Sequence, residues 1–171
     1  MDFSSEFVAL RDRMQAALDA EFVSRRNAEV AGRTAALISS FSVSTEKRMF
    51  GLIPTGKSTH AHEYRLLFAA PGMTEASLAD WWQYAQAAVG ELVKPDEDHS
   101  FSLVSLILVS DGVDKAVQKK AKKLSGEKQY DEGGWSAIRL AVVDLSEGKT
   151  YTNTSGEPLR GILKPLLQNR A

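Results

Sequence analysis

Residues 51–58, Gly-Leu-Ile-Pro-Thr-Gly-Lys-Ser, have the spacing of a phosphate-binding loop, G-x-x-x-x-G-K-[ST]. In such loops the glycines let backbone N–H groups approach phosphates, the lysine contacts the terminal phosphates, and the serine hydroxyl reaches magnesium. The loop must follow a buried strand and open a helix. Here residues 45–50 contain only two apolar side chains, and the segment after Ser58 fits a strand at least as well as a helix. We therefore expect a connector between two strands, with Lys57 and Ser58 as candidate binding residues.

Glu63 and Arg65 stand two residues apart in a second segment with possible phosphate chemistry. The expected order of a helix, three strands, a helix and a strand resembles the restriction-endonuclease-like core over about two-thirds of the chain. That resemblance implies an acidic residue on the second strand and Glu-x-Lys on the third, holding magnesium beside the scissile phosphate. Arginine stays protonated and cannot act as a base. The second strand lacks an aspartate and has only Glu46 at its start, so the active-site motif is degraded.

The chain has three histidines, His60, His62 and His99. His60 and His62 are two residues apart, so on a strand they would share one face. Together with His99 or Glu97 they could bind zinc or another divalent ion. In a solvated loop they would have no such role, and His99 would cap the strand that follows it. Because ligand spacing alone is weak support, we expect no metal and no cofactor.

Residues 94–95 (Lys-Pro), His99 and residues 134–153 resemble a small prokaryotic family of uncharacterised proteins. The resemblance is best over residues 91–153. It implies no activity, and no catalytic residue can be transferred from it.

Arg139 lies in the same region, inside a predicted strand whose other residues are mostly apolar. A buried arginine needs a carboxylate or carbonyl partner, which Asp144 or Asp111 could supply. Trp135 and Tyr151 could frame a pocket or fill the core. We expect a structural polar network around Arg139 and keep His99, Trp135 and Arg139 as candidate binding residues.

The elements that must position these residues follow from hydrophobic periodicity and capping residues. Residues 27–45 fit either a helix or a strand, and we favour a strand over 35–44. The order α-β-β-β-α-β-α-β-β-α predicts an α/β (α+β) fold, a single mixed β-sheet with helices packed on it. The predicted helices cover 4–23, 74–93, 113–124 and 158–167, and the predicted strands cover 35–44, 47–53, 62–70, 101–109, 135–145 and 150–153.

Length and composition bound the class of protein. The 171 residues suit a single domain, 1–171, and the formal net charge of −1 gives no general attraction to nucleic acid or to an anionic membrane. Without cysteine, a signal segment or a long apolar run, a soluble cytoplasmic protein is expected. Nucleic acid and membrane partners are not expected.

The expected function is therefore a non-catalytic binding or assembly domain. The adjacent Trp81 and Trp82 on one predicted helix point about 100° apart, so one of them could cover a homo-oligomer interface. A wide helix face packed on the sheet would bury both. The alternative function is a magnesium-dependent enzyme of phosphate chemistry, which would use Lys57 and Asp111 for nucleotide hydrolysis or Glu63 for nuclease activity.

Overall fold

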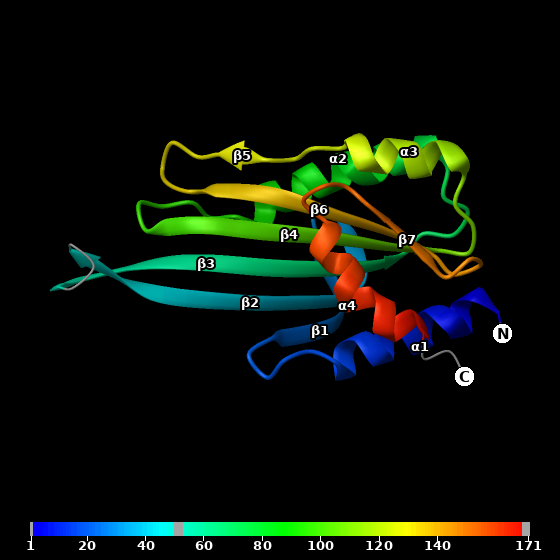
Figure 1. Ribbon diagram of the computed structural model, residues 1–171, viewed down its shortest axis with the longest axis horizontal. Helices are drawn as coiled ribbons and strands as arrows, with labels where there is room; N and C mark the ends of the chain where they lie inside the picture. Colours follow the sequence, from blue (N-terminus) through cyan, green and yellow to red (C-terminus); the bar gives the residue numbers. More distant parts are fainter. Residues whose placement is uncertain (1, 50–52, 169–171) are drawn as a thin grey trace.

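The computed structural model describes residues 2–49 and 53–168. Within these residues four helices pack on one seven-stranded mixed sheet (Figure 1). The elements are α1 (Phe3–Ala16), β1 (Val23–Val30), β2 (Arg33–Met49), β3 (Ile53–Ala69), α2 (Glu75–Leu92), β4 (His99–Ser110), α3 (Lys115–Lys123), β5 (Lys128–Gln129), β6 (Trp135–Asp144), β7 (Lys149–Thr152) and α4 (Glu157–Gln168).

The strands lie in the order β1-β2-β3-β4-β6-β5, and β7 pairs with β6 outside this path. β1, β2 and β3 form an antiparallel meander, whereas β3, β4 and β6 are parallel. Parallel neighbours need crossover connections, and here α2 and α3 lie in the two crossovers. The predicted fold class and element order are confirmed, with the two-residue strand β5 in addition.

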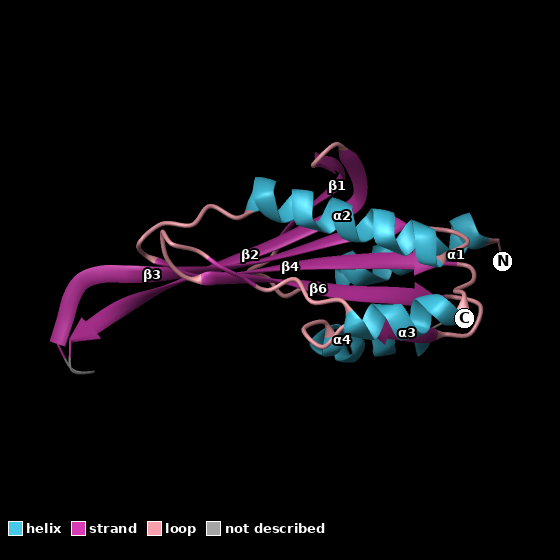
Figure 2. Cartoon of the chain, turned by 90° about the horizontal axis from the view of Figure 1, so that it is seen from above, coloured by secondary structure: helices cyan, strands magenta, loops and turns pink. Residues whose placement is uncertain are grey.

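Helices cover the two sides of the sheet unequally. α2 and α3 pack on one side over a large core that includes Leu66, Leu106 and Leu140. α1 and α4 pack on the other side over a smaller core. In Figures 1 and 2 both helices of this second side lie toward one end of the sheet. The smaller core consists of Phe7, Leu10, Met14, Leu37, Leu67, Ile107, Val109, Ala141, Val143, Leu145, Leu159, Leu163, Leu166 and Leu167.

α2 forms where local sequence signals predict it. Thr74 and Ser77 make a capping box, in which the Thr74 hydroxyl accepts from the Ser77 N–H and the Ser77 hydroxyl accepts from the Thr74 N–H. Trp81 and Trp82 are both half-buried and pack against the core under this helix. The two tryptophans therefore fit the wide helix face packed on the sheet.

Three predicted boundaries are wrong. The first helix ends at Ala16, not at residue 23, and Phe22 instead packs its ring on Phe41 at 5.5 Å. Residues 23–30 form the edge strand β1, although residue 23 was predicted to end the first helix and 27–30 lay in the stretch 27–45 that fitted either a helix or a strand. The stretch 47–53 is not a separate strand: residues 47–49 end β2, residue 53 begins β3, and 50–52 lie outside the described residues. Residues 54–59, whose composition is typical of a turn, belong to β3, where Pro54, Ser58 and Thr59 pair with β2 across a shift of register.

One buried side chain, Asn153, fastens the β7–α4 connection to the outer edge of β6. Its Oδ1 accepts from Leu140 N at 2.9 Å and from Gly156 N at 2.8 Å. Its Nδ2 donates to Ile138 O at 2.9 Å and to Leu124 O at 3.2 Å. The amide is 1% exposed, so four hydrogen bonds satisfy it without water.

Candidate functional site

The half of the sheet opposite α2 that lies away from α1 and α4 carries no helix, and we call it the open face (Figure 1). Strand register places its side chains in three rows across β2, β3, β4 and β6, because paired residues point to the same side. The rows, in order of distance from the helices, are Ser39, Arg65, Ser105 and Arg139; then Phe41, Glu63, Leu103 and Ala137; then Val43, Ala61, Phe101 and Trp135.

Four of the seven residues predicted for binding meet on the open face: Glu63, Arg65, Trp135 and Arg139. Arg65 Nε lies 2.9 Å from Glu63 Oε1, and the two side chains are 12% and 18% exposed. The Arg65 guanidinium also lies 4.5 Å from the centre of the Phe22 ring. Glu63 is thus engaged with a permanent cation, and Arg65 has its charge neutralised within the chain.

Trp135 marks the far end of the open face. Its ring stacks on Phe101 with centroids 5.3 Å apart, and the residue is 37% exposed. Stacking leaves one side of such a pair available to a flat apolar group. The expectation that Trp135 could fill the core is not met, since it lies on the surface of the sheet.

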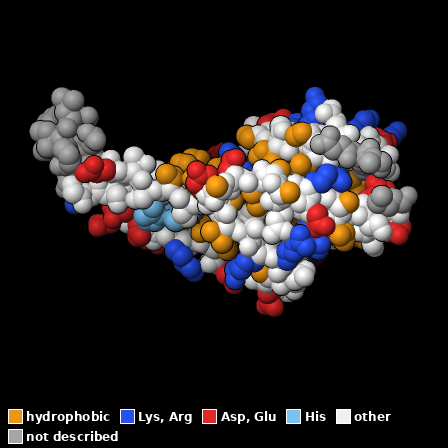
Figure 3. Space-filling model, turned by 90° about the horizontal axis from the view of Figure 1, so that it is seen from below, with side chains coloured by type: hydrophobic (Ala, Val, Ile, Leu, Met, Phe, Trp, Pro, Cys, Tyr) orange, Lys and Arg blue, Asp and Glu red, His pale blue; other side chains and the backbone are white. Residues whose placement is uncertain are grey.

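The three histidines lie together on the other side of the sheet, where they form a histidine cluster of His60, His62 and His99. Ring centroids are 4.9 Å apart for His60 and His62 and 5.7 Å apart for His60 and His99. Figure 3 shows histidine side chains gathered between the body and a projecting hairpin. The strand interpretation of His60 and His62 is confirmed, and the solvated-loop interpretation is wrong.

A continuous chain of hydrogen bonds runs through this cluster from Asp96 to Ser42. The carboxylate of Asp96 accepts from His60 Nε2 at 2.9 Å. His60 Nδ1 then accepts from His62 Nε2, 2.7 Å away, and His62 Nδ1 accepts from the Ser42 hydroxyl at 2.7 Å. With both rings neutral, each ring donates once and accepts once, so one arrangement of protons satisfies the whole chain.

The pKa values of the cluster agree with this arrangement. Burial is the main cause that lowers the pKa of His62, and the electrostatic influence of the neighbouring His60 and His99 lowers it further. The hydrogen bond from His60 holds the pKa of the Asp96 carboxyl below its usual range. Buried His99 lies beside this chain with both ring nitrogens engaged, at 2.9 Å from Gly133 O and 2.8 Å from Ser102 Oγ. The hydrogen bonds of the cluster therefore connect β2, β3 and the loop before β4.

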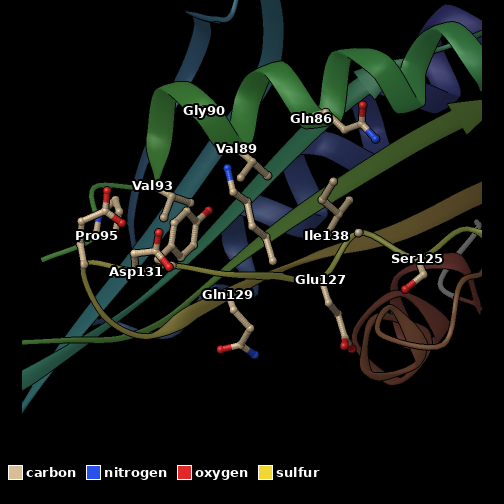
Figure 4. A pocket seen from close by; sticks show the side chains of 14 residues that line it. Gln86, Val89, Gly90, Val93, Pro95, Ser125, Glu127, Gln129, Asp131 and Ile138 are labelled. Atoms are coloured by element: carbon tan, nitrogen blue, oxygen red, sulfur yellow. The ribbon is translucent and has the colours of Figure 1, made fainter. Parts of the chain in front are cut away.

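A cleft of about 740 Å³ lies near the cluster, between α2 and the segment 125–132 that leads into β6 (Figure 4). Its apolar wall includes Val89, Val93 and Ile138, and its rim carries Glu127 and Lys128. The volume suits a small molecule. None of the residues predicted for binding lines this cleft.

The remaining candidates do not form a phosphate site. Residues 53–58 lie in β3, so Lys57 and Ser58 belong to a strand and precede no helix; Gly51 lies outside the described residues. Asp111 accepts from Gly72 N at 2.8 Å, far from Lys57 in the fold. Among residues 2–49 and 53–168, no group of three His, Asp or Glu side chains has the geometry to hold a metal ion.

Comparison with known proteins identifies one match. A family described as a domain of unknown function, DUF8052, matches residues 8–165. The chain belongs to the DUF8052 family. No curated protein and no solved structure matches this DUF8052 chain. No helix in its described residues is long and apolar enough to cross a membrane.

Sequence reasoning missed several residues that shape these sites. Ser39 and Ser105 are fully buried, and their hydroxyls have no hydrogen-bond partner in the described structure. Ser42 and Asp96 complete the hydrogen-bonded chain of the histidine cluster. Counting every second residue from Arg65 or from His62 identifies the residues of the same strand that point to the same side. It does not reveal which residues of other strands share their row.

Proposed function

We propose that this chain is a non-catalytic domain that acts by binding and assembly, and that a second copy of the chain is one of its partners. The observation that carries the proposal is a hairpin arm, residues 42–49 of β2 and 53–59 of β3, which projects from the body (Figures 1 and 2). A cytoplasmic location belongs to the same proposal and is supported by the absence of cysteine.

The arm lacks neighbours along both of its edges. The pairing of β1 with β2 begins at Val23 and Ser40, and the pairing of β4 with β3 begins at His99 and His60. Beyond these points no other strand of the described residues flanks the arm. A two-stranded ribbon is marginally stable alone, and its free N–H and C=O groups are a template for another strand.

The side chains of the arm also suit pairing between copies. Residues 42–46 and 56–58 are exposed, and Val43 is 44% exposed. They are mainly serine, threonine and valine, which are compatible with strands, and one acid and one lysine balance their charge. The charged residues along the β2 edge of the arm are Glu46, Lys47 and Arg48, and their mixed sign allows a second copy to pair with this edge.

Removing the arm tests this proposal. Residues 46–58 are replaced by a two-residue Asn-Gly turn between Thr45 and Thr59, which pair across the hairpin. We expect light scattering after gel filtration to show a dimer for the intact chain and a monomer for the shortened one. Unfolding temperatures should be similar, because the shortened chain keeps both cores and the histidine cluster.

A matched pair of point variants separates the arm from general surface effects. Val43→Lys places a charge on the arm, and Val23→Lys places the same charge on β1, where Val23 is 67% exposed. Only Val43→Lys should shift the dimer toward monomer. An intact chain that stays monomeric at every concentration would contradict the assembly proposal.

Magnesium-dependent phosphate chemistry remains the alternative, and the geometry gives it little support. A nucleotide loop needs a helix after Ser58, and a nuclease needs a second carboxylate near Glu63. The described residues place Ser58 in a strand and pair Glu63 with Arg65. The meander followed by a parallel strand supports only the likeness of element order to a restriction-endonuclease-like core.

A further inference from the structure

Arg139 is a partly buried cation that lacks an anionic partner. The partners expected from sequence are engaged elsewhere: Asp144 Oδ1 accepts from Ser146 N at 2.9 Å and from Ser146 Oγ at 2.6 Å, and Asp111 accepts from Gly72. Within residues 2–49 and 53–168, no ion pair or hydrogen bond reaches the Arg139 guanidinium. The predicted network with Asp144 or Asp111 is therefore wrong, and the partly exposed Arg139 guanidinium is open to an anion from outside the described chain.

Unsatisfied hydroxyls lie in the same row of the open face. Ser105 is next to Arg139, and Ser39 lies two strands further along. Both serines are 0% exposed and are the buried side chains of the described structure without a hydrogen-bond partner. Such groups are rare in folded proteins because leaving them unpaired costs free energy. The row therefore holds one cation without an anionic partner in the described chain, since Glu63 neutralises Arg65, and two hydroxyls that solvent does not reach.

The apolar end of the open face lies within reach of this charge. Trp135 and Arg139 are four residues apart on β6, about 13 Å along a strand. Leu103 and Ala137 lie in the row between them and carry no charge.

We propose that the open face binds a small organic anion. Its phosphate, carboxylate or sulfonate group lies on Arg139, and its flat apolar part lies on the Phe101–Trp135 pair. Arginine offers a planar set of donors that matches such anionic groups, and stacked aromatic rings favour a flat ligand. This site is independent of assembly through the arm, which uses strand edges rather than the sheet surface.

Titration with anilinonaphthalene sulfonate tests the site, because this dye is a flat aromatic anion that fluoresces in apolar surroundings. We expect saturable binding of one dye per chain, with energy transfer from Trp135. Arg139→Gln should weaken binding roughly tenfold. Arg139→Lys should weaken it less, because lysine keeps the positive charge and loses only the planar arrangement of donors. Trp135→Ala should also weaken binding. Arg25→Gln, which removes an exposed arginine from β1, should leave it unchanged.

Competition identifies the anionic group. Adenosine monophosphate that displaces the dye better than naphthoate indicates a phosphate ligand, and the reverse order indicates a carboxylate ligand. Inorganic phosphate alone should displace the dye poorly, because it lacks the flat part. Dye binding that does not saturate, or that is as tight in Arg139→Gln as in the native chain, would show apolar adsorption only and overturn the proposal. The arm-shortened chain should bind the dye normally, so failure of assembly and failure of the site are distinguishable.

Discussion

Arg65 and Arg139 lie in one row of the sheet on either side of Ser105, and replacing each with methionine should change stability in opposite directions. Methionine keeps an unbranched apolar stem at both positions and removes the charge. The difference between the two variants therefore reports what each charge contributes to the folded state.

Arg65→Met leaves the Glu63 carboxylate, which is 18% exposed, without its partner at 2.9 Å. Breaking a buried ion pair costs about 3–5 kcal/mol, and the partial exposure of this pair reduces the expected loss to about 2–3 kcal/mol. Arg139→Met removes a charge that has no partner in the described chain, so we expect a gain of about 0.5–1 kcal/mol. For a domain of this size 1 kcal/mol corresponds to about 2–4 °C in unfolding temperature.

Urea unfolding followed by circular dichroism, with calorimetry alongside, measures both changes. The slope of free energy against urea should stay constant, so that shifts of the midpoint report stability. The double variant Glu63→Gln with Arg65→Met should recover part of the loss, because no unpaired carboxylate remains. A loss of about 2 kcal/mol or more in Arg139→Met would mean that Arg139 has a structural role, and it would refute the argument for an unpaired cation.

Two further predictions concern the histidine cluster and the hydrogen bonds of Asn153 at the edge of β6. Burial and the neighbouring histidines lower the pKa of His62, so protonation favours the unfolded chain and stability should fall as pH drops below 6.5. Urea titrations across this range should show a weaker fall in His62→Gln; parallel curves would contradict the assignment. Asn153→Ala should lose about 3 kcal/mol in thermal unfolding, because four backbone groups each lose a hydrogen bond and, within the described residues, only Gly156 N keeps a second one, to the backbone oxygen of residue 153. Thr154→Ala, at an exposed neighbouring position, is the control, and equal losses would count against this account.

Local sequence patterns were enough to predict the elements whose stability is largely local. Residues 74–93 carry a cap and an apolar stripe, and α2 forms there within one residue at each end. The strand β1 was missed because most of its side chains are exposed, so its burial shows no regular alternation. The position of β1 depends on its hydrogen bonds to β2, and such pairing between strands is not encoded in the local sequence pattern. The same reason explains residues 54–59, where pairing with β2 overrides a turn composition.

The candidate site could be predicted by residue type but not by arrangement. Glu63 and Arg65 were selected for their likeness to a nuclease motif, Trp135 as a side chain that could frame a pocket, and Arg139 as a charge inside an apolar strand. The register of β3, β4 and β6 brings them to one side of the sheet. Register depends on the packing of whole strands, so a single sequence does not reveal which residues of other strands share the row of Arg139. Strand alternation alone already places Asp144, five residues further along β6, on the opposite side. The buried serines carried no sequence signal, because serine is common in strands and loops alike.

Polar groups have hydrogen-bond partners on one side of these strands and lack them on the other, and this contrast indicates where a ligand is expected. On the side of α2, His62 bonds to Ser42 and His99 bonds to Ser102, so polar groups beyond the core satisfy one another. On the open face the Ser105 hydroxyl and the Arg139 guanidinium have no hydrogen-bond partner among the described residues, although β4 and β6 each pair with neighbouring strands on both sides. Unsatisfied buried groups are rare in folded proteins, and functional sites are among the places where they persist. A ligand is therefore expected on the open face rather than at the histidine cluster, whose hydrogen bonds are already complete.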